Sequence, residues 1–155
     1  MQTENVRELF QIITRNFGLL NKHCCSTEEY KISLAQSHIL DELRRRSKPS
    51  MQEVSESLGI DITTFSRQIQ NLIKMGLVEK TANPSDKRVF TLSLTNEGKK
   101  VNQSIDDRVN NYLKEVFSHM NEFEQDIVIR SIKLLSVSMN KTKYFSKNTR
   151  ESDCS

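Results

Sequence analysis

The segment that decides the fold runs over residues 50–95 and reads SMQEVSESLGIDITTFSRQIQNLIKMGLVEKTANPSDKRVFTLSLT. Its beginning predicts a short helix over residues 50–58. Ser50 and Glu53 stand at the spacing of a capping box, in which each side chain accepts a hydrogen bond from the other residue's backbone. Gly59 follows this helix and suits the positive φ that often ends one. The segment therefore opens with a helix that has its own start and stop signals.

A second helix is predicted over residues 61–75, with one apolar face and one polar face. Asp61 is a favourable N-cap for it. The apolar face, which we expect to be buried, consists of Ile62, Phe65, Ile69, Leu72 and Ile73. The candidate DNA-binding residues are hydroxyl, amide and cationic side chains: Thr63, Thr64, Ser66, Arg67, Gln68, Asn71 and Lys74. No carboxylate follows Asp61 in this helix, which suits a surface that approaches phosphates.

A β-hairpin is predicted after the second helix, because two strand-like runs at 77–81 and 88–94 flank a polar turn. Asp86, Lys87 and Arg88 are expected at or near its tip, with Asp86 close enough to orient Arg88, and they complete the set of candidate DNA-binding residues. A helix, a tight turn, a helix and a hairpin form the layout of a winged helix-turn-helix. A helix fits the DNA major groove, and a hairpin beside it can reach the backbone or the minor groove.

The chain resembles the multiple-antibiotic-resistance regulator (MarR) family of bacterial transcription factors over about residues 6–139. The wing carries the most specific part of the resemblance, in GLVEK at 76–80, DKR at 86–88 and LSLTNEG at 92–98. The usual wing of the family reads acidic-x-x-Asp-x-Arg and then Leu-x-Leu-Thr-x-x-Gly, and here Asn83 stands at the first acidic position. The resemblance implies a mostly helical homodimer with a β-wing in each subunit. Such a dimer binds a pseudo-palindromic operator, commonly as a repressor, and is often released by a small ligand, a metal or an oxidant.

The predicted fold class is mostly α with a small β-hairpin wing. We expect one domain over residues 1–140, with a winged helix unit at about 33–98. Residues 4–22 and 99–140 carry apolar stripes at helical spacing and are the expected dimerisation helices. A single larger monomeric core is the other interpretation of these stripes. A dimer is favoured because it provides two DNA half-sites.

Composition limits the partners of the chain. With 23 Lys and Arg against 20 Asp and Glu, the formal net charge is only +3. Nucleic-acid binding therefore depends on local cationic clusters. They comprise Arg44, Arg45, Arg46, Lys48, Arg67, Lys74, Lys80, Lys87 and Arg88. The three consecutive arginines have two interpretations, phosphate contact or a solvated helix end.

No targeting or membrane segment appears in the sequence. The N-terminus is polar, and no apolar run approaches the roughly 18 residues of a membrane span. We therefore expect a cytoplasmic protein. Residues 141–155 are polar and are expected to be a flexible tail.

An effector-sensing site is a further hypothesis, based on His23, Cys24, Cys25 and His38. Thiolate and imidazole groups suit soft ions such as zinc, copper or arsenic-type ions. The two adjacent cysteines are also candidates for oxidation. Ordinary packing of small apolar thiols is the third interpretation. No resident cofactor is predicted.

Two other functions remain as alternatives to a DNA-binding regulator. One is an enzyme with Cys24 or Cys25 as nucleophile and a neighbouring histidine as base. The other is a winged helix that binds only proteins. The sequence holds no Gly-rich phosphate loop and no nucleophile elbow, so we predict a non-enzymatic protein. A gel shift with a steep salt dependence discriminates among these functions.

Overall fold

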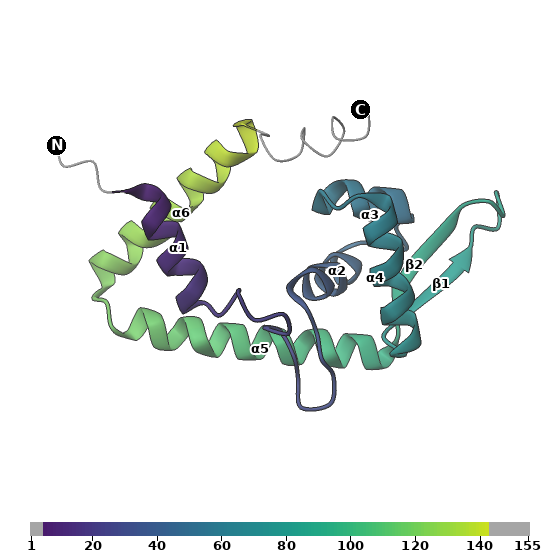
Figure 1. The fold of residues 1–155 in the computed structure, drawn as a ribbon, viewed down its shortest axis with the longest axis horizontal. Coiled ribbons are helices and arrows are strands. Elements are labelled where there is room, and N and C mark those ends of the chain that lie inside the picture. Colours follow the sequence, from purple (N-terminus) through teal and green to yellow (C-terminus); the bar gives the residue numbers. More distant parts are fainter. Residues whose placement is uncertain (1–4, 143–155) are drawn as a thin grey trace. The chain divides into compact units, whose positions relative to one another are not determined.

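The computed structural model describes residues 5–142, and within them six helices and one two-stranded sheet (Figure 1). The elements are α1 (Val6–Asn16), α2 (Leu34–Arg45), α3 (Met51–Leu58), α4 (Ile62–Lys74), β1 (Val78–Ala82), β2 (Phe90–Leu94), α5 (Asn96–Ser118) and α6 (Glu122–Thr142). The predicted mostly helical fold with a small hairpin is confirmed. The chain forms two compact units, one ending at Ile105 and the other beginning at Asp106.

The predicted start and stop signals of α3 are present in the structure. Ser50 Oγ accepts a hydrogen bond from the Glu53 amide at 3.1 Å, and Glu53 Oε2 accepts one from the Ser50 amide at 2.6 Å. Gly59 ends the helix with φ of +65°, in the left-handed region. Asp61 then opens α4 by accepting a hydrogen bond from the Thr64 amide at 2.9 Å. These local signals fix the angle at which α4 leaves α3.

The core of the first unit is built by α2, α3, α4, the hairpin and the start of α5. Its fully buried large side chains are Ile32, Ile39, Leu40, Val54, Phe65, Ile69, Leu72, Leu77 and Leu92. The predicted burial of the apolar face of α4 is wrong at two positions, since Ile62 is 52% exposed and Ile73 is 36% exposed. Ile62 is the first residue of α4, and Ile73 lies about 100° around the helix from Leu72, so both lie at the edge of the buried stripe.

The hairpin is antiparallel, and Val78 pairs with Leu94 at its base while Ala82 pairs with Phe90 towards its tip. The second strand begins two residues later than the sequence predicts, because the Val89 amide donates to the Asp86 carbonyl and stays in the turn. The hairpin is also hydrogen-bonded to the segment that directly precedes α3. The Leu92 amide donates to the Pro49 carbonyl at 2.9 Å.

The end of the wing passes into α5 through a close backbone contact. A Cβ built on Gly98 would lie 2.0 Å from the carbonyl oxygen of Leu77, so this position requires glycine. Thr95 Oγ1 accepts a hydrogen bond from the Gly98 amide at 2.9 Å and donates one to the Gly76 carbonyl at 2.6 Å. The Thr-x-x-Gly part of the wing motif therefore fixes α5 to the end of α4.

The flanking helices differ from this core. Neither α1 nor α6 contains a buried residue, and buried residues of α5 are confined to its first ten positions. Lys141 and Thr142, predicted to begin a flexible tail, are the last two residues of α6. The rest of that predicted tail lies outside the described residues. Over residues 5–142, no helix has the length and apolar character needed to cross a membrane.

Candidate nucleic-acid interface

The polar face of α4 is exposed over most of its length. Its exposed candidates are Thr63, Thr64, Arg67, Asn71 and Lys74, whereas Ser66 and Gln68 are half-buried. Arg67 and Lys74 form no ion pair with any residue in the described part of the chain. Because α4 contains no carboxylate, its cations are available to an external anion.

One exposed residue of this face is missing from the sequence prediction. Gln70 is exposed and lies three residues after Arg67 and seven after Thr63. Residues at these spacings share one side of a helix. The spacing would have identified Gln70 as a further amide on the outer face.

The wing tip holds its arginine as predicted. Asp86 Oδ1 accepts a hydrogen bond from the Arg88 amide at 3.0 Å and a second from Arg88 Nε at 3.3 Å. The Arg88 side chain remains 92% exposed. Asn83 takes the place of the family's acidic residue and accepts a hydrogen bond from the Ser85 amide at 2.9 Å. A carboxylate is therefore not needed at position 83 to hold this turn.

A second cation lies along the wing. Lys80 Nζ is 4.2 Å from the centroid of the Phe90 ring, within the range of a cation–π contact. Phe90 is 40% exposed, because it lies beyond the buried base of the hairpin formed by Leu92 and Leu94. The contact gives an exposed aromatic ring a partner and keeps the Lys80 charge on the hairpin.

The three consecutive arginines at the end of α2 are engaged within the protein. Arg44 pairs with Asp41 at 3.0 Å, Arg45 pairs with both Asp41 and Glu42, and Arg46 pairs with Glu42. Of the two interpretations of this cluster, the structure favours a helix end with its own ion pairs. The cluster adds less free positive charge to the surface than the sequence alone indicates.

Glu42 is the centre of this network and is only 6% exposed. Its Oε1 also accepts a hydrogen bond from Ser57 Oγ at 2.9 Å, which joins α2 to α3. Burial opposes ionisation of this carboxyl, but hydrogen bonds from Arg46 and Ser57 and the nearby arginine charges lower its pKa below its ordinary value. The carboxylate therefore acts as an ionised link between the two helices.

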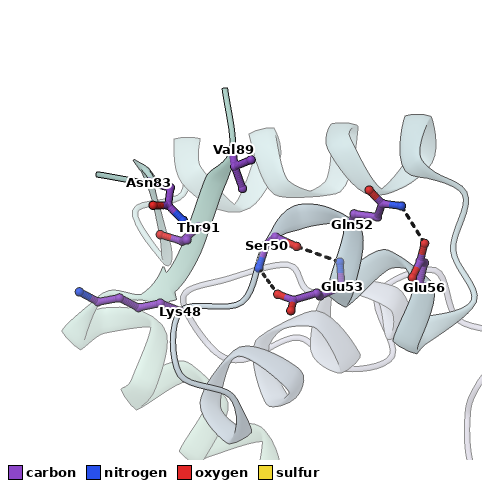
Figure 2. A pocket seen from close by; sticks show the side chains of 8 residues that line it. All are labelled: Lys48, Ser50, Gln52, Glu53, Glu56, Asn83, Val89 and Thr91. Carbon is purple, nitrogen blue, oxygen red and sulfur yellow. Dashed lines mark hydrogen bonds between the residues drawn. The ribbon is translucent and has the colours of Figure 1, made fainter. Parts of the chain in front are cut away.

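A shallow pocket of about 400 Å³ lies between α3 and the wing (Figure 2). Lys48 is the one cation among its lining residues. Its carboxylates are engaged locally, since Glu53 accepts from the Ser50 amide and Glu56 accepts from Gln52 Nε2 at 2.9 Å. The pocket thus combines charges of both signs and does not extend the cationic surface of α4.

The residues predicted to sense an effector are only partly brought together. Cys24 Sγ and Cys25 Sγ lie 3.3 Å apart, with Cys24 half-buried and Cys25 8% exposed. His23 and His38 are both exposed. Within residues 5–142, no group of three or more His, Cys, Asp or Glu side chains is arranged to hold a metal ion. The structure therefore shows a pair of adjacent thiols rather than a closed metal cage.

A helix-turn-helix with a carboxylate-free outer face and an adjoining hairpin defines a winged helix protein. Residues 32–90 match the model of the MarR family. This match confirms the predicted resemblance to the MarR family.

Three known proteins illustrate this relationship. The chain is 27% identical over 121 residues to the HTH-type transcriptional regulator BilQ of Clostridioides difficile (strain CD3), a match that covers 76% of this chain and 80% of BilQ. It is 29% identical over 73 residues to the HTH-type transcriptional repressor MdtR of Bacillus subtilis (strain 168), covering 47% of each chain. FabT of Streptococcus pneumoniae, solved in complex with DNA, has the same fold, with a TM-score of 0.77, 19% identity, and coverage of 88% of this chain and 96% of FabT. BilQ and MdtR, the two relatives compared by sequence, are named as transcriptional regulators, in agreement with the predicted non-enzymatic role of this chain.

Proposed function

We propose that the protein is a sequence-specific DNA-binding transcriptional regulator that represses genes by occupying a pseudo-palindromic operator as a homodimer. The outer face of α4 would lie in the major groove, and the wing would contact the backbone or the adjacent minor groove. As a regulator of this kind it would act on chromosomal DNA in the cytoplasm. Repression is the mode given in the name of MdtR, and DNA binding is given for FabT.

The observation that carries this proposal is the chemistry of the α4 surface. Arg67 and Lys74 stand among exposed hydroxyl and amide groups, with no carboxylate on the helix. An exposed helix of a globular protein ordinarily carries charges of both signs. Arg and Gln side chains at such a surface supply the bidentate contacts that distinguish guanine and adenine.

The dimer is supported by the exposed apolar side chains of the flanking helices. In α1, Val6 and Ile13 are 61% and 59% exposed, and in α6, Leu134 and Ile132 are 70% and 58% exposed. Contiguous apolar patches are uncommon on monomers and mark interaction surfaces. A second copy of the chain would cover them and would present two copies of α4 to two half-sites.

Release from DNA by an effector completes the proposal. The effector classes remain a small ligand, a metal or an oxidant. Such a molecule must bind the non-binding conformation more tightly, and a differential affinity of about 100-fold corresponds to about 2.7 kcal/mol of coupling.

The test is binding to the DNA fragment upstream of the protein's own coding region, measured by fluorescence anisotropy over a series of salt concentrations. We expect tighter binding to this fragment than to an equally long fragment of shuffled sequence. The logarithm of the affinity should fall linearly with the logarithm of salt concentration. Equal affinity for both fragments would contradict sequence-specific regulation at this site.

The reading surface is tested with Arg67→Ala and Gln68→Ala. Each variant should lose about 1–3 kcal/mol of specific binding for a lost base contact. Arg130→Ala is the matched control, because Arg130 is 78% exposed and lies on α6. Its binding should stay near that of the wild type. Wild-type affinity in both α4 variants would show that another element reads the sequence.

A further inference from the structure

The two adjacent cysteines lie in a hydrogen-bonded turn. The Cys24 amide donates to the Asn21 carbonyl at 3.1 Å, and both the amide and the hydroxyl of Ser26 donate to the His23 carbonyl. The Cys24 and Cys25 sulfur atoms are 3.3 Å apart, and neither residue is in a disulfide. The turn therefore holds two thiols side by side before any ligand arrives.

This turn is connected to the start of α2 by two hydrogen bonds. The Cys25 amide donates to the Ile32 carbonyl at 3.2 Å, and the Ile32 amide donates to Ser26 Oγ at 3.0 Å. Ile32 is fully buried and directly precedes Ser33, the N-cap of α2. A change in the backbone of the turn would therefore reach the first turn of α2, and α2 as a whole contacts both α3 and α4.

The sulfur separation selects a class of ligand. Soft ions bind thiolates at about 2.3 Å. At that length, two sulfurs 3.3 Å apart subtend an angle of about 90° at a shared ion. Tetrahedral zinc needs a wider angle and four ligands. No cluster of three His, Cys, Asp or Glu ligands exists among the described residues to supply them. Trivalent arsenic is pyramidal, and its bond angles are close to the angle of about 90° that the two sulfurs define. In an organic arsenical the third substituent is already bonded to arsenic, so the protein needs to supply only two sulfur ligands.

A disulfide fits this pair less well than a shared ion. It would require the sulfurs to approach to about 2.05 Å within a ring that includes the connecting peptide. An arsenic atom can bridge the sulfurs near their present separation. Cys24 is half-buried rather than enclosed, which gives the reagent a path to the pair.

We propose that Cys24 and Cys25 form a bidentate site for trivalent arsenicals, and that occupancy of this site weakens DNA binding. In the reaction, an arsenic oxide R–As=O condenses with both thiols to give a cyclic dithioarsenite. Two As–S bonds form, two S–H bonds and the As=O bond break, and one water carries away the oxygen and both protons. No oxidation state changes. The effect on DNA rests on the proposed function, whereas the binding reaction does not.

The binding reaction is tested by treating the full-length protein with phenylarsine oxide and measuring its intact mass. We expect one adduct per chain, with a mass equal to protein plus reagent minus one water. A chelate of two thiols should survive an excess of 2-mercaptoethanol and should be removed by 2,3-dimercaptopropanol. Cys24→Ser and Cys25→Ser should each abolish this resistant adduct. Cys154→Ser, which removes the third thiol of the chain, should retain it.

An adduct of unchanged resistance in Cys24→Ser or in Cys25→Ser would overturn the site. So would the lack of any resistant adduct in the wild-type protein. Both results are independent of DNA.

The regulatory part is tested with the upstream DNA fragment and the same reagent. Treated wild-type protein should bind at least tenfold more weakly, which is about 1.4 kcal/mol. The untreated Cys24→Ser and Cys25→Ser variants should bind as wild type does and should show no response to the reagent. Adduct formation with unchanged DNA affinity would overturn the coupling. Failure of untreated wild-type protein to bind DNA would instead contradict the proposed function, while the adduct data would stand.

Discussion

The winged helix unit and the two flanking helices α1 and α6 use their apolar residues in opposite ways. In α4, Phe65 and Leu72 are fully buried and Ile69 is 1% exposed. In α6, side chains of the same kinds, such as Phe123 and Leu134, are more than two-thirds exposed. Both helices have apolar residues in abundance, yet only one of them finds its packing partners within its own unit.

This difference shows what amphipathic spacing can and cannot predict. Spacing identifies a face that must leave water, since burial contributes about 25 cal/mol for each Å² of apolar surface. It does not identify the surface that covers that face. In α4 the covering surface comes from α2, α3 and the wing. For α1 and α6 we propose that it comes from a second chain.

The largest expected effect tests the packed side of this comparison. Phe65→Ala should lower the free energy of unfolding by about 3–5 kcal/mol, because it removes a fully buried ring from the core. Ile62→Ala in the same helix is the control, and as a surface change it should cost under about 1 kcal/mol. Urea denaturation followed by circular dichroism measures both. Similar losses in the two variants would mean that α4 is not divided into buried and exposed positions as described.

The next effect tests the exposed side. The double change Ile132→Glu with Leu135→Glu places two charges on the apolar surface of α6 and should raise the dimer dissociation constant at least 100-fold, about 2.7 kcal/mol. Sedimentation equilibrium measures this constant. Ser136→Glu is the control, because it adds a charge at an exposed polar position of the same helix. A double variant that stays fully dimeric would place the contact elsewhere.

Much of the winged helix was predictable because its signals are local. A cap, a turn or a motif glycine is specified by residues within a few positions, as Ser50 with Glu53 and Asp86 with Arg88 illustrate. Gly98 is predictable as part of a motif, but its reason is not local. It permits contact with the Leu77 carbonyl, 21 residues earlier in the chain.

The predictions that were wrong, and the residues whose roles the sequence did not reveal, both depend on contacts between distant parts of the chain. The exposure of Ile62 and Ile73 depends on where the neighbouring elements end, which helical spacing does not reveal. The role of Glu42 is hidden for the same reason. A carboxylate within a helix sequence ordinarily indicates a solvated face, and only the approach of Ser57 on α3 makes Glu42 a buried link.

Glu42 provides a prediction about pH. Its pKa in the folded protein is lowered from the ordinary value of 4.5. Its contribution to stability is therefore present above pH 4.5 and is lost as the pH falls through the lower folded pKa. At neutral pH, Glu42→Gln should cost about 1.5–3 kcal/mol of unfolding free energy, the range for hydrogen bonds to charged groups.

The measurement is urea denaturation of the wild type and Glu42→Gln at pH 7 and at several values below 4.5. The difference between the two proteins should shrink as the wild-type carboxylate is protonated. Glu56→Gln is the matched control, since Glu56 is exposed and does not contact Glu42, Arg46 or Ser57 through a hydrogen bond or an ion pair; it accepts a hydrogen bond from Gln52 Nε2 instead. A difference that stays constant over the acid range would show that the charge of Glu42 is not what stabilises the link.

The smallest expected effect concerns the wing tip, which is the exposed end of the otherwise well-packed winged helix unit. Arg88 has no packing role, with a side chain that is 92% exposed, so Arg88→Ala should leave unfolding unchanged. If Arg88 neutralises one phosphate, the slope of log affinity against log salt should become shallower by about 0.9. Binding should weaken by a similar factor on the upstream fragment and on shuffled DNA, because a phosphate contact carries no sequence information.

Asp86→Ala separates the charge of Arg88 from its orientation. It removes the two hydrogen bonds that orient Arg88 but retains the guanidinium charge, so its slope should stay close to that of the wild type while its affinity falls. An Arg88→Ala variant with both the affinity and the slope of the wild type would leave the tip with no part in binding, and the exposed face of α4 would then account for the whole electrostatic contact.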